Sequence, residues 1–183
     1  MSFTKRSFNT PALVLKRTNI GESDRIVTLL TPNQGKVVCV AKGVRKLTSS
    51  QSAALEPGNH VSVFLIQTHS LPLVTQTKLL NDFTETKKTL RGMKKLMQVL
   101  EVVDKLFPEG VEEVELFETV LNIVKQLNQS QKSFEHIQDQ LTNILVQLGY
   151  QDPHETTYKS VLDYVAALAD RPMRSYEYLT VKK

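Results

Sequence analysis

The chain has 183 residues, of which 40% are hydrophobic and 23% charged, and its formal net charge is +4. This composition excludes an intrinsically disordered chain, and the length allows one domain or two small ones. The single cysteine, Cys39, excludes a disulfide framework and a zinc site built from several thiolates of one chain.

The sequence carries no recognisable targeting or membrane signal. Residues 1–6 are basic, but the polar residues that follow them do not form the apolar core of a signal peptide. No apolar run approaches the roughly 20 residues of a membrane span. We therefore expect a soluble, cytoplasmic protein without membrane contact.

The first 83 residues predict a small β-barrel. They contain five short runs rich in Val, Ile, Leu and Thr, separated by turn residues, at positions 12–17, 25–30, 36–41, 60–66 and 73–79. Residues 32–35 are typical of a tight hairpin turn, whereas residues 47–56 form a longer connection with room for a helical turn at 53–55. Five strands with a longer connection between the third and fourth indicate an OB-fold barrel.

The remaining residues have a helical period. Apolar stripes run through 93–106, 114–124, 134–148 and 158–168, with Ser133 expected to cap the third helix and Gly149 to end it. Four amphipathic helices of this length predict a bundle. The fold class is therefore α+β, with an OB-fold DNA-binding domain at 1–83 and a helical domain at 84–183.

Charge is distributed unevenly between these two parts. Residues 1–83 carry ten Lys and Arg against four Asp and Glu, a net charge of +6, whereas residues 84–183 carry thirteen against fifteen, a net charge of −2. A basic half of this kind indicates nucleic acid or another anionic surface as its partner. The alternative is a solvated basic face without a partner.

A cationic turn is the sharpest candidate site. Lys42, Arg45 and Lys46 surround Gly43 directly after an apolar run, an arrangement suited to holding phosphates by charge. Further basic residues recur along the predicted strands. The complete candidate DNA-binding set is Lys16, Arg17, Arg25, Lys36, Lys42, Arg45 and Lys46. For a lone lysine the alternative is solubility, and for Arg25 it is an ion pair with Glu22 or Asp24.

Aromatic residues are scarce in the basic half. Residues 1–83 contain no Tyr or Trp and only Phe3, Phe8, Phe64 and Phe83, of which Phe64 is expected in the core and Phe83 at the junction with the helices. OB-folds that hold single strands tightly stack bases on aromatic rings. We therefore expect binding mainly through phosphates, which leaves base edges free to pair.

No pattern predicts an enzyme. His69 beside Ser70 lacks a nucleophile elbow and a matched acid, so it is interpreted as a loop histidine. The spacing of Asp24, Glu56 and Asp82 does not support a metal-dependent nuclease, and Glu56 before a proline is expected to fix a turn. Cys39 is interpreted as a core residue, and we expect neither a cofactor nor a metal.

The residues between 22 and 57 resemble the N-terminal half of RecO, the bacterial recombination mediator family. The resemblance rests on residues 22–31, Gly35, the 41–46 segment, Ser50 and residues 55–57. It continues weakly through residues 71–72 and the first helices and strengthens again at 134–150 and 171–175. Most RecO proteins carry a four-cysteine zinc lobe after the segment matching residues 148–150. Here residues 151–155 lead almost directly into the last helix, so the zinc lobe is expected to be absent.

The resemblance implies a non-enzymatic protein of DNA repair and recombination. Such a protein binds single- and double-stranded DNA, promotes strand annealing and, with RecR, assists RecA loading on DNA coated by single-strand-binding protein. The family docks the tail of that protein on its helical domain. A groove with Lys94, Lys95, Lys125 or Lys132 at its rim would suit such an acidic tail, although a purely structural bundle is the alternative.

A second class of function stays open beside the mediator. The chain could be a protein-interaction adaptor whose barrel and helical bundle bridge repair proteins, with little DNA binding of its own. Annealing of complementary oligonucleotides, with and without Lys42, Arg45 and Lys46, discriminates between these classes.

Overall fold

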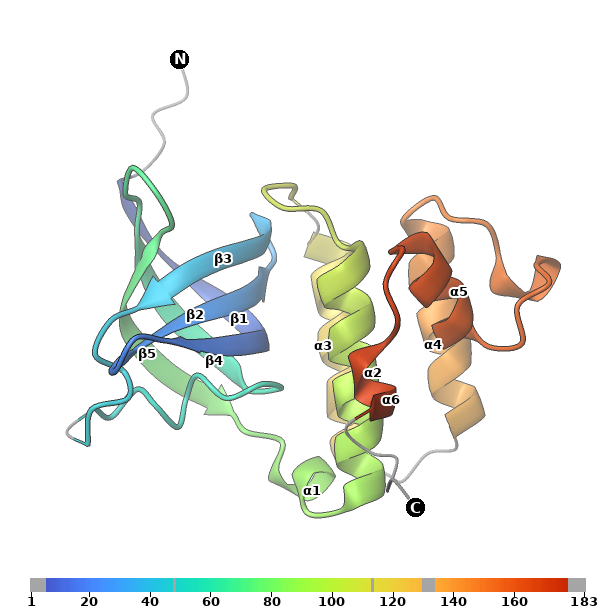
Figure 1. Ribbon diagram of the computed structural model, residues 1–183, viewed down its shortest axis with the longest axis horizontal. Coiled ribbons are helices and arrows are strands. Elements are labelled where there is room, and N and C mark those ends of the chain that lie inside the picture. Colours follow the sequence, from blue (N-terminus) through green and yellow to red (C-terminus); the bar gives the residue numbers. More distant parts are fainter. Residues whose placement is uncertain (1–5, 48, 113, 130–133, 178–183) are drawn as a thin grey trace. The chain divides into compact units, whose positions relative to one another are not determined.

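The computed structural model describes residues 6–47, 49–112, 114–129 and 134–177. Five strands are followed by helices (Figure 1), which confirms the predicted α+β class. The strands are β1 (Ser7–Ile20), β2 (Asp24–Thr31), β3 (Gly35–Ala41), β4 (His60–Ile66) and β5 (Leu73–Asn81). Each contains a predicted run, and β1 extends well beyond its run because its first half pairs with β4.

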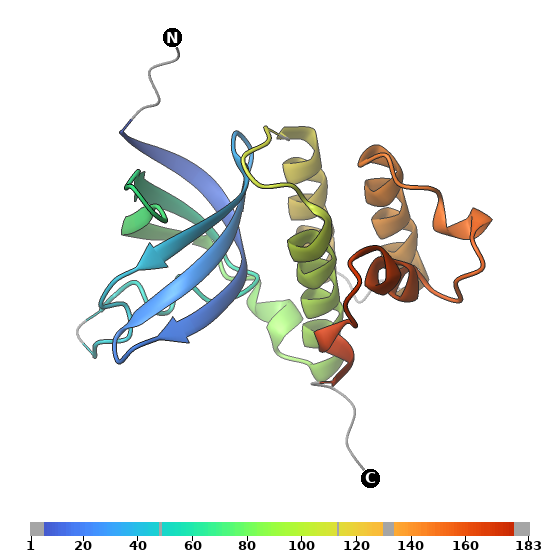
Figure 2. The same cartoon turned by 45° about the horizontal axis from the view of Figure 1, so that its top comes forward.

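The strands close into a barrel in the order β1-β2-β3-β5-β4 (Figures 1 and 2). The long strand β1 pairs with β2 through its second half and with β4 through its first half, both antiparallel. A short parallel pairing of β3 with β5 completes the circuit, where the Val40 amide donates to the Pro72 carbonyl at 2.8 Å. Every strand therefore has a neighbour on both sides.

The interior of the barrel is filled by alternate side chains of its strands. Strand β4 shows it most simply, because Val61, Val63 and Leu65 are fully buried while the residues between them are partly exposed. Cys39 on β3 is also fully buried in this core, and burial raises the pKa of its thiol to about 12. The interpretation of Cys39 as a small core residue is confirmed.

The connection between β3 and β4 covers part of the core. It contains a succession of turns, and the Leu55 amide donates to the Gln51 carbonyl at 3.2 Å, which forms the single helical turn anticipated there. Leu55 is 0% exposed and Ala54 6%, and both belong to the barrel core. The connection therefore contributes hydrophobic packing as well as chain closure.

A later segment of the chain returns to the barrel. The first compact unit consists of residues 1–82 together with 108–117, and the second of residues 83–107 and 118–183. The Lys36 amide donates to the Pro108 carbonyl at 3.2 Å, and Glu109 forms isolated bridges with Gly35 and Lys36. Gly35 has φ +55°, and a Cβ there would stand 2.3 Å from the Val111 carbonyl oxygen. Glycine is thus required by this close approach as well as by the turn.

The second unit is helical. Its elements include α1 (Thr84–Lys87), α2 (Leu90–Leu106), α3 (Val114–Gln129), α4 (Phe134–Gln147), the 3₁₀ turn η1 (Pro153–Glu155), α5 (Val161–Leu168) and α6 (Arg174–Glu177), although α3 begins within the returning segment. Phe83 directly precedes α1, which confirms its expected place at the junction. Gly149 ends α4 with φ +85°, as predicted, while Ser133 lies outside the described residues.

One of the predicted helical stripes begins before its helix. Tyr158 is 45% exposed and precedes α5, whose N-cap is Ser160 because its hydroxyl accepts from the Asp163 amide at 3.1 Å. The Tyr158 ring still contacts α5 from outside the helix, because its centroid lies 5.4 Å from that of Tyr164. The stripe predicted from Val114 begins with the first residue of α3, although the Val114 side chain is 44% exposed.

The segment 171–175 is fixed to the polar side of α2. The carboxylate of Glu101 accepts from the Arg174 amide at 2.6 Å and from the Ser175 amide at 2.8 Å. Lys105 Nζ donates to the carbonyls of Arg171 and Pro172 at 3.0 and 3.3 Å. Met173 between these contacts is 3% exposed.

Within the described residues, no helix is long and apolar enough to cross a membrane.

Candidate nucleic-acid interface

The cationic turn follows β3 and is fixed by its own backbone. Val44 is 2% exposed and packs in the barrel core, so the turn is held from inside while Lys42, Arg45 and Lys46 are exposed. The Arg45 amide donates to the Ser23 carbonyl at 2.9 Å, and the Lys46 amide donates to the Gly43 carbonyl at 3.1 Å. Three exposed cations are therefore displayed on a rigid support.

Asp24 at the start of β2 stabilises this turn. Its Oδ1 accepts from the Gly43 amide at 2.7 Å and from the Ser23 hydroxyl at 3.0 Å. The Gly43 hydrogen bond, then the Ser23 hydrogen bond and the charges of Lys42 and Lys46, lower the pKa of the Asp24 carboxyl below its usual 3.8. The turn between β1 and β2 and the cationic turn are thus joined by one carboxylate.

We expect this junction to persist until strongly acidic pH. Because the folded-state pKa of Asp24 is depressed, its stabilising contribution is present above the unfolded value and is lost only as pH falls through the folded value. In NMR spectra the Gly43 amide resonance should titrate with a midpoint below 3.8. Asp24→Asn is the control and should abolish that titration. A midpoint at or above 3.8 would contradict the assignment.

Arg17 and Arg25 do not belong to this exposed surface. Arg25 is 8% exposed, and its guanidinium donates to Glu56 Oε1 at 3.1 Å, to the Ser52 carbonyl at 3.3 Å and to Asn19 Oδ1 at 3.2 Å. Arg17 Nε donates to Glu56 Oε2 at 2.8 Å. The expected alternative partners of Arg25, Glu22 and Asp24, are replaced by Glu56. One carboxylate therefore pairs with both arginines.

The register explains why these two arginines point inward. Arg25 has the same parity on β2 as Val27 and Leu29, whose side chains fill the core. Arg17 is the direct partner of Val27 across the β1–β2 ladder, so it shares that face. Arg25 lies near the strand ends, where its register partners are Asn19 and Ala41. Residues 26–30 of β2 are almost continuously apolar, so the sequence carried no alternating signal for this placement.

The other two candidates are on the barrel but at separate places. Lys16 is exposed on β1, beyond a bulge, and pairs in register with Thr28. Lys36 lies at the opposite end of β3 from the cationic turn, half-buried beside the returning segment 108–117. The structure therefore brings together Lys42, Arg45 and Lys46, and not the full set.

One aromatic side chain lies elsewhere than expected. Phe64 is half-buried on the face of β4 opposite the core residues Val63 and Leu65, so its assignment to the core was wrong. Its register partners are Asn9 and Gln76, both exposed. Phe8, by contrast, packs against the barrel core.

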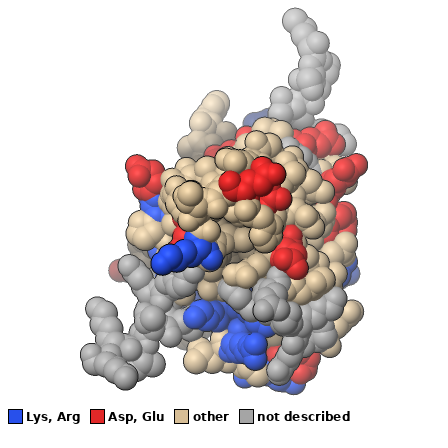
Figure 3. All heavy atoms as spheres, turned by 90° about the vertical axis from the view of Figure 1, so that its right-hand side faces the viewer, with Lys and Arg blue, Asp and Glu red and all other residues tan. Residues whose placement is uncertain are grey.

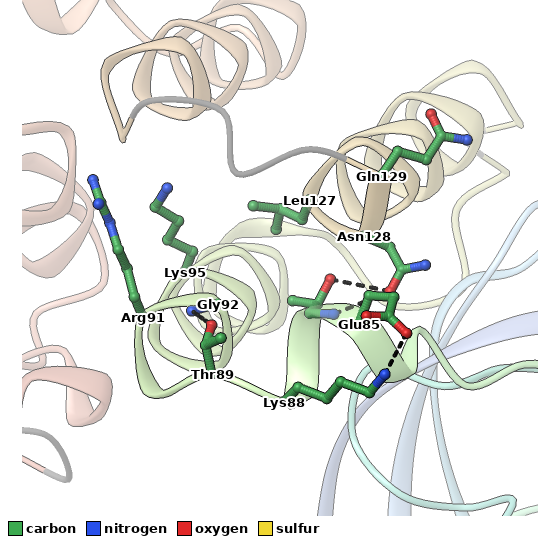
Figure 4. Close-up of a pocket in the computed structure, with 10 residues that line it drawn as sticks. Glu85, Lys88, Thr89, Arg91, Gly92, Lys95, Leu127, Asn128 and Gln129 are labelled. Carbon is green, nitrogen blue, oxygen red and sulfur yellow. Dashed lines mark hydrogen bonds and ion pairs between the residues drawn. The ribbon is translucent and has the colours of Figure 1, made fainter.

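A second candidate site lies in the helical unit. A pocket of about 340 Å³ is lined by residues of α1, α2, the turn between them and the end of α3 (Figure 4). Its basic side chains are Lys88, Arg91 and Lys95, and Leu127 supplies an apolar wall. Lys95 is 5% exposed, and burial, together with the charge of Arg91, lowers the pKa of its ammonium group.

The pocket owes its shape to a tight corner between α1 and α2. Thr89 caps α2 by accepting from the Gly92 amide at 3.0 Å, and Asn128 Oδ1 accepts from the Thr86 amide at 3.1 Å (Figure 4). Of the predicted groove residues, Lys95 lines the pocket, Lys94 and Lys125 do not, and Lys132 lies outside the described residues. Lys88 and Arg91 were missed, although the Thr89 capping position could have indicated the corner.

Surface charge is mixed. Figure 3 shows acidic and basic side chains on one face of the molecule, with several Asp and Glu in its upper part and Lys and Arg below them. This mixture agrees with the small net charge of residues 84–183. Among the described residues, the pocket holds three cations and one acid, because Glu85 also lines it and accepts from Lys88 Nζ at 2.6 Å, which leaves Arg91 and Lys95 as its further cations (Figure 4).

The residues considered for catalysis have other roles. His69 lies in the exposed connection after β4, where the neighbouring Ser70 amide donates to the Thr68 hydroxyl at 3.2 Å, and it is the predicted loop histidine. Asp24 and Glu56 are occupied by the contacts above. Glu56 also accepts from the Asn59 amide at 3.1 Å through its carbonyl, which agrees with its expected role in a turn.

The donor set does not fit a zinc lobe. The cysteine at position 39 is buried in the barrel. Within residues 6–47, 49–112, 114–129 and 134–177, no three His, Cys, Asp or Glu side chains are grouped to hold a metal ion. The connection from α4 to α5 is short and contains η1, whose N-cap is Asp152.

Comparison with known proteins shows which family the first part of the chain is similar to. Residues 1–83 match the protein family described as Recombination protein O N terminal. This match covers all five strands, the cationic turn and the connection with Leu55 and Glu56.

Relatives extend the similarity into the helices. A DNA repair protein RecO of Syntrophomonas wolfei is 33% identical over 139 residues, which are 76% of this chain and 56% of the relative. The protein of the same name from Roseiflexus is 33% identical over 123 residues, 67% of this chain and 43% of the relative. That of Dehalococcoides mccartyi is 28% identical over 144 residues, 79% and 57% respectively. The chain spans about half the length of the curated relatives it matches, and none of these names states a catalytic activity.

Proposed function

We propose that this chain, which belongs to the RecO family of DNA repair proteins, binds single- and double-stranded DNA through its phosphates and promotes the annealing of complementary strands. In repair and recombination it would act with RecR to assist RecA loading on DNA coated by single-strand-binding protein. The reaction is one of binding and positioning, so the proposal assigns no catalytic residue.

The observation that carries this proposal is the cationic turn. Lys42, Arg45 and Lys46 are exposed within five residues, and the turn is fixed by Val44 inside the barrel and by Asp24 beside it. A pre-organised group of cations loses little conformational entropy when it binds phosphates. Arg45 also donates to the Gly21 carbonyl at 3.0 Å, so one of its nitrogens is already oriented.

The barrel supports the same conclusion. Its strand order, with β1 between β2 and β4 and a longer connection before β4, is the arrangement that we assign to the OB-fold. With no Tyr or Trp in residues 1–83, aromatic stacking platforms are scarce, and contacts to phosphates would dominate. Bases held in this way remain free to pair with a second strand.

The salt dependence of affinity tests the proposal. If four to six phosphates are neutralised, the logarithm of the binding constant for single strands should fall with the logarithm of salt concentration at a slope of roughly −3 to −5. Replacing Lys42, Arg45 and Lys46 together by alanine should make that slope shallower by about 2 and abolish fluorescence-quench annealing. Fluorescence anisotropy of a labelled oligonucleotide measures the slope.

A matched triple variant controls for net charge. Lys125, Lys159 and Arg171 belong to the helical unit and do not line the pocket, and their replacement by alanine removes the same number of positive charges. This variant should keep the wild-type slope and annealing. A slope near zero for the wild type would overturn the proposal, and unchanged annealing in the folded Lys42, Arg45 and Lys46 variant would favour the adaptor class.

A second function is favoured by the pocket in the helical unit. We propose that it receives the acidic C-terminal tail of single-strand-binding protein. Arg91 and Lys95 would pair with carboxylates, and Leu127 would contact an apolar terminal residue. Charge and apolar surface at the same opening match a peptide that carries both.

Charge reversal tests this docking site. Arg91→Glu should weaken binding of an acidic peptide with a free hydrophobic C-terminal residue about tenfold, an effect of about 1.4 kcal/mol. Lys159→Glu makes the same change of charge outside the pocket and should leave affinity unchanged. Equal affinity of both variants would exclude the pocket. A pull-down with RecR and with single-strand-binding protein tests the remaining partners.

A further inference from the structure

Leu47 is exposed to an unusual degree. Its relative exposure is 106%, the highest among the large hydrophobic residues that the structure describes, and the next is Leu90 at 72%. Single surface leucines are common and need no explanation on their own. The surroundings of Leu47 set it apart, because it directly follows the cationic turn.

The backbone places Leu47 at the corner of a second turn. The Ser49 amide donates to the Lys46 carbonyl at 2.9 Å, which makes Leu47 the first corner residue of that turn. Gly, Pro, Asn, Asp and Ser favour such corners for conformational reasons, and leucine offers none of these advantages. The geometry of the turn therefore does not account for the apolar side chain.

The contacts of the residues just before Leu47 restrict the position of its backbone. Val44 is held in the core, and the Arg45 amide is bonded to the Ser23 carbonyl, two residues before Leu47. A strand of DNA bound by Lys42, Arg45 and Lys46 would therefore lie beside an apolar side chain. DNA has the matching pattern, since its phosphates are anionic and the faces of its bases are apolar.

We propose that Leu47 is a wedge that inserts against or between the bases of DNA held by the cationic turn. Leucine acts in this way in proteins that partly unstack base steps. It would supply the apolar contact for which aromatic residues are scarce in this barrel. The inference rests on the proposed DNA binding and adds a base contact to it. Single strands are the favoured substrate, because no base pair has to be broken.

Oligonucleotides that contain 2-aminopurine test the wedge, since the fluorescence of this base rises when it is unstacked. Saturating wild-type protein should raise the fluorescence of a single strand, and Leu47→Ser should lose most of that increase. The salt slope of Leu47→Ser should equal that of the wild type, because no cation is removed. Leu47→Met should retain the signal, and Leu90→Ser, at an exposed leucine of the helical unit, is the control.

The two readouts separate the possible failures. Salt-dependent binding of the wild type without any rise in fluorescence would overturn the wedge and leave phosphate binding intact. A full fluorescence increase with Leu47→Ser would do the same. Absence of binding in the anisotropy measurement would overturn the proposed function, and the wedge with it.

Discussion

Replacing Leu55 by alanine should lower the free energy of unfolding by about 3 kcal/mol, within the range of roughly 2 to 5 measured for buried leucines. Leu55 is 0% exposed and packs in the barrel core, although it lies in a connection and not in a strand. The substitution removes apolar contacts from a site where the surrounding strands are closed into a barrel and have little freedom to collapse.

Leu47→Ala is the matched control, because the same side chain is removed from the same connection at a fully exposed position. Its effect on stability should stay within about 0.5 kcal/mol. Urea denaturation followed by circular dichroism measures both variants. A loss below about 1 kcal/mol for Leu55→Ala would mean that the connection does not cover the core in solution.

Glu56→Ala should cost about 2 kcal/mol. The carboxylate accepts from both Arg17 and Arg25, and the Arg25 side chain is only 9% exposed, so its removal leaves a buried guanidinium without its anionic partner. Complete loss of a buried partner costs roughly 3 to 5 kcal/mol. The effect is smaller here because the Glu56 side chain is 37% exposed and Arg25 keeps Asn19 and Ser52.

Two further variants sharpen this prediction. Glu56→Gln keeps acceptor capacity without the charge, and its loss of stability should fall between those of the wild type and Glu56→Ala. Glu22→Ala removes an exposed acid nearby in the sequence of Arg25 and should change stability by less than about 0.5 kcal/mol. Equal stability of Glu56→Ala and Glu22→Ala would show that Arg17 and Arg25 do not need the Glu56 carboxylate as a partner.

The spacing of apolar residues along the chain predicted most of the strands and helices, because each element buries one of its faces. Strand β4 was predicted with its observed bounds because its buried face alternates strictly with a more exposed one. The extension of β1 to Ser7 was not predicted, because it depends on pairing with β4, more than fifty residues later. Tyr158 was misplaced because spacing alone does not show where Ser160 caps the helix.

The prediction of the candidate site was limited in the same way, because part of the site depends on residues that are distant in the sequence. The cationic turn was recognisable because its residues are consecutive and charged. Because residues 26–30 of β2 are almost all apolar, neither the inward direction of Arg17 and Arg25 nor the identity of their partner could be read from the sequence. Glu56 is separated from them by 39 and 31 residues, and only the closed barrel brings the three together. The pocket likewise combines the start of α2 with the end of α3.

The path of the chain has a consequence for its synthesis. Residues 108–117 belong to the barrel unit, whereas residues 83–107 belong to the helical one. On the ribosome, the barrel can acquire its last segment only after all of α2 has been made. A fragment that ends at residue 83 would lack the backbone contacts that Pro108 and Glu109 make with Gly35 and Lys36. The natural unit for expressing the barrel is therefore a longer polypeptide than its five strands.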